Sequence, residues 1–513
     1  MEPVRMPPEK PTSSLLKISK KFHRIIGIVG LLYFAAMALS GILLNHPDLI
    51  TDYDLPRSML PGDYEYRQWN RNSFRSLTTT GYGRFINGEG GVWQLSGKIT
   101  PVDFNAGLPE SVYLRDTRDL TESGGLLWAA TRGGLFVRGR GASRWEPVKL
   151  AEEPEGVVDL VKYGDSLIAL TRSDIYFSEA SAPSVFKAVT PKREAEEEPK
   201  RSLFMLVFEL HSGELWGLGG RLFIDLIGVF LLFASITGGW FWWKRWRGSL
   251  SSGRGGKLAR KGLKLHIKLG VYLTPLLLYI ALTGIFQRPP LLIAIADATY
   301  EIKHHPAPLD PNPWHDIIRK GLYDKARETL LLATSEGFYE GGIEGLLSGG
   351  ETFRKLREPT PPVSVMGATV LEELEAGHLV GSMSGLFLWG RDTGTIVDLF
   401  TKKSPEAPKG PPVGKEMVVG FSREGGLWAD YDRGLMRGWG KAAGIQMPPA
   451  LAKEGRISLW HALFELHNGR IFTFLLGWWA WIVIPLGGLA LLTETATGFY
   501  DRIGYKLFRR KKR

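Results

Sequence analysis

Four histidines occupy matching positions in the two halves of this 513-residue chain. His211 lies in the motif FELHSG and His467 in FELHNG, and each motif precedes a long apolar stretch. His23 and His266 lie where two other apolar stretches begin. Two neutral imidazoles close both axial positions of a haem iron, which suits electron transfer. The four positions therefore predict two haem b groups, one held by His23 with His266 and one by His211 with His467.

Two further histidines and two carboxylates are candidates near the His211 pair. His46 and His461 are alternative ligands there. Glu209 and Glu465 each precede a paired histidine by two residues. Because a carboxylate beside a ligand histidine can orient its ring through a hydrogen bond, we expect these glutamates to support the ligands.

A structural role is the alternative for each of these residues. His23 is then one more polar residue at a helix end, and Ser212 or Asn468 caps a helix while its neighbouring histidine fills space. Three loop histidines could bind a metal or an iron chelate, although loop histidines usually lie on the surface; they are His304, His305 and His315. We predict no catalytic side chain, since no nucleophile or zinc motif appears.

The composition narrows the possible cofactors and partners. The chain has no cysteine, which excludes disulfides, thiolate-bound iron–sulfur clusters and covalently attached c-type haem. The net charge is +11, but no nucleic-acid motif accompanies it. We therefore expect the basic residues to set membrane topology and to contact anionic lipid, with no nucleic-acid partner.

Four apolar windows are long enough to cross a bilayer core of about 30 Å as helices. They are Ile25 to Leu44, Leu222 to Trp243, Leu269 to Phe286 and Ile471 to Thr493. Asp225 is the one charged residue in them. A continuous helix from His23 to His46 would cover about 34 Å, so the two histidine pairs are expected near opposite faces of the membrane.

The distribution of basic residues predicts the orientation. Residues 244–268, 501–513 and 1–24 hold nine, seven and six Lys or Arg, against none, one and two acidic residues. Because cytoplasmic loops near membrane spans accumulate Lys and Arg, both termini and the middle loop are expected in the cytoplasm of a bacterial cell, with the long inserts in the periplasm.

The predicted segments alternate between the membrane and its two sides. They are a cytoplasmic tail at 1–20, spans at 21–46 and 264–287, helices that include spans at 203–246 and 457–500, outer β-rich segments at 47–202 and 288–456, a basic loop at 247–263 and a basic tail at 501–513.

Both outer segments contain short apolar strands separated by glycine-containing turns. Clear copies of this pattern lie near Trp128, Ile168, Val380 and Trp428, and weaker ones begin near Gly90 and Tyr339. Within each half they recur every 37 to 48 residues or so, which is the period of a propeller blade. The predicted fold class is thus a four-helix transmembrane bundle with one propeller-like β domain built from both segments. Two independent β-rich or α+β domains are the alternative.

The membrane segments repeat as well. His23, Gly27 and Ser40-Gly41 match His266, Gly270 and Thr283-Gly284 at an offset of 243, and His211 matches His467 at an offset of 256. The second unit ends in ITGGWFWW in one half and TATGFYD in the other. Each half is therefore predicted to consist of a helix, an outer segment and a second helix.

These motifs resemble the PepSY-associated transmembrane proteins, which include iron-regulated membrane proteins and ferric-siderophore reductases. The matching elements are His23-Arg24 with Gly27, the LH-S-G and LH-N-G elements, Ile236 to Gly238 and the Trp-rich end before Lys244. The resemblance implies a haem-bearing bundle that moves electrons across the membrane to an acceptor such as a ferric chelate. No standard PepSY domain is visible in the outer segments.

We thus expect a membrane cytochrome that takes electrons from a cytoplasmic reductase or the quinone pool and passes them to a periplasmic acceptor or partner protein. No flavin or nicotinamide motif is present, so the reductant comes from elsewhere. The alternative belongs to another class of function. It is a haem-free sensor or scaffold whose outer domain binds a partner protein. A transporter subunit is a third, favoured by the duplicated halves.

Overall fold

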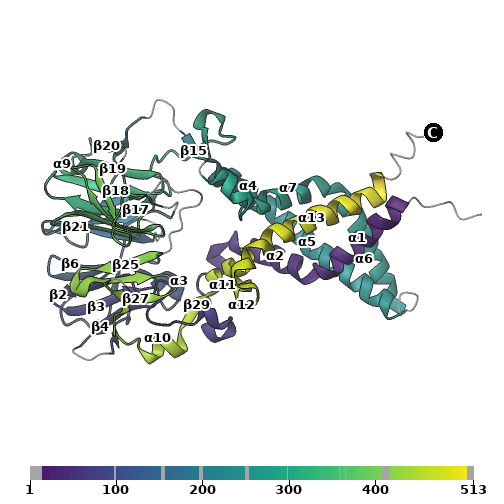
Figure 1. Cartoon of the computed structure of the whole chain (residues 1–513), viewed down its shortest axis with the longest axis horizontal. Helices are drawn as coiled ribbons and strands as arrows, with labels where there is room; N and C mark the ends of the chain where they lie inside the picture. The colour runs from purple at the N-terminus through teal and green to yellow at the C-terminus, as the bar shows by residue number, and fades with distance from the viewer. Residues whose placement is uncertain are drawn as a thin grey trace, which may run out of the picture. The chain divides into compact units, whose positions relative to one another are not determined.

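The chain forms two compact units, here named the helical unit and the β-rich unit (Figure 1). The helical unit comprises Met1–Pro47, Lys200–Ala307 and Leu463–Arg513, and the β-rich unit comprises Asp48–Pro199 and Pro308–Ala462. The structure, a computed structural model, describes residues 14–96, 100–151, 156–195, 200–248, 253–296, 298–357, 359–363, 366–405, 416–438 and 440–504. The predicted tails and basic loop lie partly outside these ranges.

The helical unit is built from long apolar helices and short connecting ones. These are α1 (Ser14–Val29), α2 (Leu31–Leu44), α4 (Leu203–Ser212), η4 (Glu214–Trp216), α5 (Gly217–Trp246), α6 (Gly253–Tyr272), α7 (Thr274–Ile285), α8 (Leu291–Ile295), η5 (Ile302–His304), η7 (Arg470–Phe472), α12 (Thr473–Leu476), η8 (Gly477–Ile482), α13 (Val483–Phe499) and η9 (Tyr500–Gly504). Strands β15 (Lys200–Ser202) and β16 (Thr299–Glu301) form a small sheet, and α11 (Leu459–His467) carries the chain from the β-rich unit into this one.

Two segments in the described residues are long and apolar enough to cross a membrane, Glu214–Trp246 and Arg470–Ile503. The number rises to four if each of two bent helix pairs is one span. The first predicted span is such a pair, since α1 and α2 meet at Gly30 with a bend of 61°. The third is α6 and α7, bent by 69° where Pro275 begins α7. Glycine disfavours a helix interior and proline lacks the N–H that would continue one. The estimate of about 34 Å from a straight helix therefore does not hold.

Close helix contacts repeat in the two halves. A Cβ on Gly228 of α5 would lie 3.0 Å from Ile42 of α2, and a Cβ on Gly488 of α13 would lie 2.3 Å from Ile285 of α7. Because only hydrogen fits at these positions, each pair of helices packs at short range, as small residues allow in membranes. Buried apolar side chains complete the packing, among them Ile227, Phe230, Leu277, Phe34, Ala281 and Leu491.

The β-rich unit contains six antiparallel sheets of four strands, one of which gains a fifth strand, β14 (Lys192–Arg193), in parallel. In chain order the four strands of each sheet are β2 (Ser76–Thr80), β3 (Gly83–Gly88), β4 (Gly91–Leu95) and β5 (Val102–Asp103); β6 (Thr117–Ser123), β7 (Leu126–Thr131), β8 (Gly134–Arg138) and β9 (Glu146–Val148); β10 (Val157–Tyr163), β11 (Ser166–Thr171), β12 (Ile175–Ser178) and β13 (Phe186–Val189); β17 (Ile318–Asp324), β18 (Thr329–Thr334), β19 (Gly337–Gly342) and β20 (Thr352–Lys355); β21 (Val370–Leu374), β22 (Gly377–Ser382), β23 (Gly385–Gly390) and β24 (Thr395–Asp398); β25 (Val418–Ser422), β26 (Leu427–Asp430), β27 (Gly434–Arg437) and β28 (Lys441–Ala442).

Short elements connect these sheets. They are the strand pair β1 (Asp54–Pro56) with β29 (Arg456–Ser458), the helices α3 (Val112–Arg115), α9 (Ile343–Leu347) and α10 (Pro449–Glu454), and the 3-10 turns η1 (Pro47–Leu49), η2 (Arg57–Met59), η3 (Gly62–Tyr64) and η6 (Glu424–Gly426).

The first strands of the six sheets contact one another in cyclic order. β2 contacts β6, β6 contacts β10, β10 contacts β17, β17 contacts β21, β21 contacts β25 and β25 contacts β2. Apolar residues that alternate along the strands fill the spaces between sheets, for example Phe85 with Leu127 and Ile168 with Leu332. The repeats predicted near Trp128, Ile168, Val380 and Trp428 are central strands of these sheets. Most of both inserted segments, Asp48–Pro199 and Pro308–Ala462, belongs to one unit, whereas residues 288–307 belong to the helical unit.

Asp116, between α3 and β6, forms ion pairs with arginines of two sheets, the one that begins with β2 and the one that begins with β6. Its carboxylate accepts hydrogen bonds from Arg75 (3.0 Å) and Arg132 (3.2 Å) and is 4% exposed. Burial alone would raise the pKa of Asp116, but the charges of Arg75, Arg132 and Arg118 outweigh it and hold that pKa well below its ordinary value. The stabilisation is therefore present above the unfolded-state pKa and is lost only as the pH falls through the lower folded-state value.

We predict that Asp116→Asn lowers the free energy of unfolding by about 3–5 kcal/mol near neutral pH, because it leaves buried arginines without their counter-charge. Thermal unfolding of the purified chain measures the effect, which should shrink in strong acid. Asp165→Asn, in an exposed turn, is the matched control. Equal unfolding temperatures for the two variants would contradict this role.

Candidate functional site

The structure brings the four predicted histidines together as two pairs within the helical unit. The ring centres of His23 in α1 and His266 in α6 are 6.3 Å apart, and their planes meet at 79°. The ring centres of His211 in α4 and His467 in α11 are also 6.3 Å apart, with planes at 52°. Each pair joins one histidine from each half of the chain, as the sequence repeat predicts.

The spacing of each pair fits two imidazoles on opposite sides of one metal ion. With metal–nitrogen bonds of roughly 2 Å, the centres of two such rings lie about 6 Å apart. Within the described residues no group of three or more His, Asp or Glu side chains is placed to hold a metal. The two pairs are therefore the candidate site.

Hydroxyl groups hold the Nδ1 atoms of the second pair. Nδ1 of His211 lies 3.0 Å from Oγ1 of Thr283, and Nδ1 of His467 lies 2.9 Å from Oγ of Ser40. Each hydroxyl donates its own hydrogen to a carbonyl oxygen four residues earlier in its helix. It must therefore accept from Nδ1–H, which leaves the lone pair of Nε2 free to bind a metal.

The first pair is held in a related way. Nδ1 of His266 lies 3.4 Å from Oγ1 of Thr237, which donates to the carbonyl of Phe233. Nδ1 of His23 lies 3.0 Å from the carbonyl oxygen of Glu494 and 3.2 Å from Oε1 of the same residue. Here too the hydrogen bonds occupy Nδ1 and leave Nε2 available.

A glycine lies against the ring edge of every paired histidine. A Cβ on Gly41 or Gly284 would lie 3.1 Å from Cε1 of His467 or His211, respectively. A Cβ on Gly498 would lie 3.0 Å from Cε1 of His23, and on Gly238 the distance to His266 would be 3.7 Å. Each glycine follows the serine or threonine of a Ser/Thr-Gly step in a neighbouring helix. We name these four steps the ring seats: Ser40-Gly41, Thr283-Gly284, Thr237-Gly238 and Thr497-Gly498.

The FELHSG and FELHNG motifs end the short helices that carry the second pair. Gly213 and Gly469 adopt left-handed conformations, with φ of 80° and 78°, and stop each helix just after its histidine. Ser212 and Asn468 also cap the next helical turn, because the Ser212 side chain accepts from the backbone N–H of Glu214 and the Asn468 side chain accepts from that of Arg470. The capping role and the histidine pairing are therefore both present in the same motif.

The alternative ligands lie elsewhere. Nε2 of His46 is 2.6 Å from Oδ2 of Asp225, whose other oxygen accepts from Asn45. Nδ1 of His461 is 3.6 Å from Oε1 of Glu89 in the β-rich unit. Neither of these contacts is with another histidine, and the first-choice ligands remain His211 and His467. Asp225 is satisfied by polar neighbours, as a buried intramembrane acid must be.

The two glutamates proposed to orient the rings have arginine partners instead. Oε1 of Glu209 lies 2.6 Å from Arg201, and Glu465 forms an ion pair with Arg470. At Nδ1 of His211 and His467 the structure places hydroxyl groups, so the orienting role passes to the ring seats. The sequence contains this signal, since Ser40-Gly41 matches Thr283-Gly284 and ITG matches ATG.

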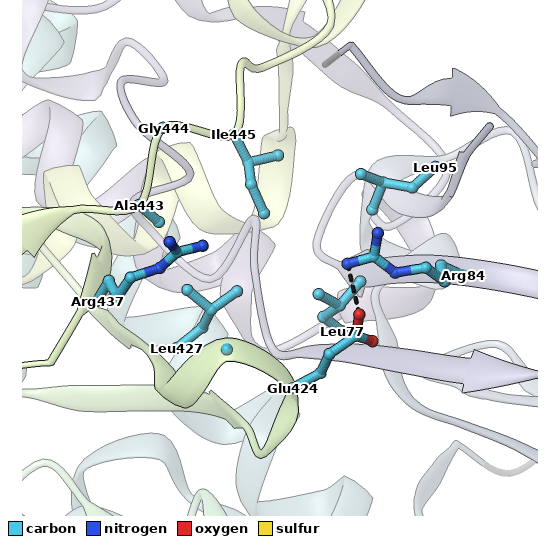
Figure 2. A pocket seen from close by; sticks show the side chains of 10 residues that line it. Leu77, Arg84, Leu95, Glu424, Leu427, Arg437, Ala443, Gly444 and Ile445 are labelled. Carbon is cyan, nitrogen blue, oxygen red and sulfur yellow. Dashed lines mark ion pairs between the residues drawn. The ribbon is translucent and has the colours of Figure 1, made fainter. Parts of the chain in front are cut away.

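Other candidate features are not part of this site. Nδ1 of His305 forms a hydrogen bond of 2.6 Å with the hydroxyl of Tyr300. Nδ1 of His315 lies 3.4 Å from Oδ2 of Asp310. Figure 2 shows a cavity of about 430 Å³ in the β-rich unit, where Arg84 and Glu424 form an ion pair of 2.6 Å across an apolar floor. This cavity is lined by residues of the first and the last of the six sheets.

The apolar helices, the paired histidines and the large β-rich unit define a membrane protein with an extensive domain outside its spans. Residues 162–500 match the family described as PepSY-associated TM region, which is more than half of the chain. The chain belongs to this family, as the sequence motifs predict.

Comparisons with other proteins add few details. No curated protein matches the sequence. Among solved structures, the extracellular domain of BT4673 of B. thetaiotaomicron, described as a putative one component system, is similar with a TM-score of 0.33 and 10% identity over 72% of this chain. The computationally designed Ika8 protein matches with a TM-score of 0.29 and 10% identity over 72% of this chain and 87% of its own. This chain spans 39% of the length of the BT4673 structure.

We predict that Thr283→Val weakens haem binding at the His211 pair by about 10–100-fold, because the ring loses the partner that fixes its orientation. Titration of haem into the purified apo-chain, followed by absorbance, measures this affinity. Thr274→Val in the same helix is the matched control, since Thr274 bonds only to the carbonyl of Gly270 in the contacts described. Unchanged affinity in Thr283→Val would show that the hydroxyl does not position the ligand.

Proposed function

We propose that this protein is a di-haem b cytochrome that carries electrons across the bacterial cytoplasmic membrane. The observation that carries the proposal is the paired arrangement of His23 with His266 and of His211 with His467, each at 6.3 Å between ring centres. Haem iron held by two imidazoles supplies one-electron transfer, because no axial position is open to oxygen or substrate.

The chain's own residues prepare both pairs for this task. The hydroxyl groups of Ser40, Thr283 and Thr237 occupy Nδ1 of three imidazoles and Glu494 occupies that of His23, which leaves Nε2 as the metal-binding nitrogen in each ring. Because the glycines carry no side chain, each ring can approach the neighbouring helix. The helix ends that carry the second pair are also tied down, since Asn45 donates to the carbonyl of Ser212 and Arg288 donates to that of Asn468. Rigid ligands of this kind limit the rearrangement that accompanies a change of charge.

The length of helix α5 favours two haem sites at different depths in the membrane. Gly220 near its start packs against Gly213, just after His211, and Gly238 near its end faces His266. Eighteen residues at 1.5 Å each separate these positions by roughly 27 Å, close to the thickness of the hydrocarbon core. We place one haem near each face of the membrane, in a four-helix bundle in which each bent pair is one span.

The remaining features of the proposal rest on charge and on the sheet arrangement. The basic stretches favour cytoplasmic termini and a cytoplasmic loop, with the β-rich unit in the periplasm. We propose that its six sheets, in cyclic contact, form a propeller-like domain. The donor is a cytoplasmic reductase or the quinone pool, and the acceptor is a ferric chelate or a periplasmic partner protein. The ferric chelate is the acceptor that the resemblance to ferric-siderophore reductases implies.

The purified chain should contain two haem b per polypeptide in a pyridine haemochrome assay. His266→Ala should lose one haem and keep the other, because its partner His23 cannot close both axial positions alone. His266→Ala combined with His211→Ala should lose both. His315→Ala, an exposed histidine of the β-rich unit, is the control and should retain two.

A haem-free chain would favour the sensor or scaffold alternative and refute the proposal. Retention of two haems in His266→Ala would refute the pairing.

A further inference from the structure

In the described residues, five arginines and two aspartates lie at the end of the β-rich unit where the first strands of its sheets begin. We name this group the arginine cluster: Arg75, Asp116, Arg118, Arg132, Arg172, Asp316 and Arg319. Three of the arginines pair with Asp116, and Arg172 pairs with Asp316 through a hydrogen bond of 2.9 Å. The cluster therefore carries an excess of positive charge.

Two of the arginines lack a carboxylate at hydrogen-bond distance in the described part of the chain. The closest approach of Arg118 to Asp116 is 3.8 Å, because Arg75 and Arg132 already occupy both carboxylate oxygens. Arg319 donates to two backbone carbonyls, of Asp316 at 2.7 Å and of Ile318 at 3.0 Å. Both guanidinium groups keep donors that these contacts do not use.

Arg118 and Arg319 occupy the same special position in different sheets. In β6 the pairing register skips Arg118, between Thr117 and Asp119, and in β17 it skips Arg319 in the same way. Such bulges redirect a side chain and are frequent beside functional sites. In β10 the bulged residue is Val158, so a bulge here does not itself require arginine.

Arg172 lies in the sheet between the sheets that carry Arg118 and Arg319. It belongs to the turn between β11 and β12, in the sheet that follows β6 and precedes β17. Burial lowers the pKa of Arg118 to about 9, and the charges of Arg132, Arg75 and Arg172 act in the same direction while Asp116 opposes them. Burial also lowers the pKa of Arg319 to about 10, again with Arg172 as a like charge. Arg118 and Arg319 thus each experience repulsion from Arg172, whose own side chain is 45% exposed, and an anion would relieve this repulsion.

We propose that the arginine cluster binds a small multivalent anion bearing carboxylate or phosphate groups, held by Arg118, Arg172 and Arg319. Guanidinium groups recognise both oxyanions through paired hydrogen bonds, and three guanidiniums match a ligand with more than one charged group. Asp116 and its two arginines form the rigid wall of this site. The proposal concerns the β-rich unit alone and does not depend on haem.

Isothermal titration of the full chain in detergent, at low salt, with citrate and separately with pyrophosphate tests this site. Saturable binding of one equivalent is expected for at least one probe, and the preferred probe identifies the ligand as carboxylate or phosphate. Arg118→Gln and Arg319→Gln should each weaken binding by about tenfold or more, because each removes charge-assisted hydrogen bonds. Arg118→Lys, which keeps the charge and loses the planar fork, should give a smaller loss.

Arg437→Gln is the matched control, since this arginine lines the separate cavity of Figure 2. It should bind both probes as the unmodified chain does, and haem content should be the same in all these variants. The proposal is overturned if neither probe binds at millimolar concentration, or if Arg437→Gln weakens binding as much as Arg118→Gln. It is also overturned if folded Arg319→Gln, checked by its unfolding temperature, binds like the unmodified chain.

Discussion

The hydrogen bond at Nδ1 of each paired histidine is the constraint on which the membrane part depends. An imidazole can offer only one nitrogen to a metal, and its orientation is set by the partner of the other nitrogen. In this protein that partner comes from a neighbouring helix, at a serine or threonine followed by glycine, or at a backbone carbonyl. Helix packing, ring direction and metal-binding capacity are therefore set together. The bends at Gly30 and Leu273 are part of this arrangement. In the first span His23 lies before the bend and Ser40-Gly41 after it. In the third span His266 lies before the bend and Thr283-Gly284 after it.

Several charged residues differ between the duplicated halves, and two of these are acidic residues of α13 and α5. Glu494 lies beside His23 in α13, whereas the corresponding position near His266 is Ala234 at an offset of 260. Asp225 in α5, bound by His46 and Asn45, corresponds to Pro485 in the second half. The surroundings of the paired histidines are thus unequal, although the distance between ring centres is the same in both pairs.

The sequence predicted the features that repeat within the chain. The four paired histidines, the apolar spans, the strands near Trp128 and Trp428 and the family could be inferred, because duplication shows which residues share a role. The helix bends and the arginine partners of Glu209 and Glu465 could not, since they depend on distant segments. The ring seats were visible only as small-residue steps, and a Ser/Thr-Gly step is far more often a helix contact. The arginine cluster draws on four sheets, so no local pattern indicates it.

An experimental structure of the purified chain in lipid or detergent tests the central claim most directly. The account predicts density for a porphyrin between the imidazoles of His23 and His266, and for a second between those of His211 and His467, with Nδ1 of each ring on its helix partner. Rings that face away from each other, with no macrocycle between them, would contradict it.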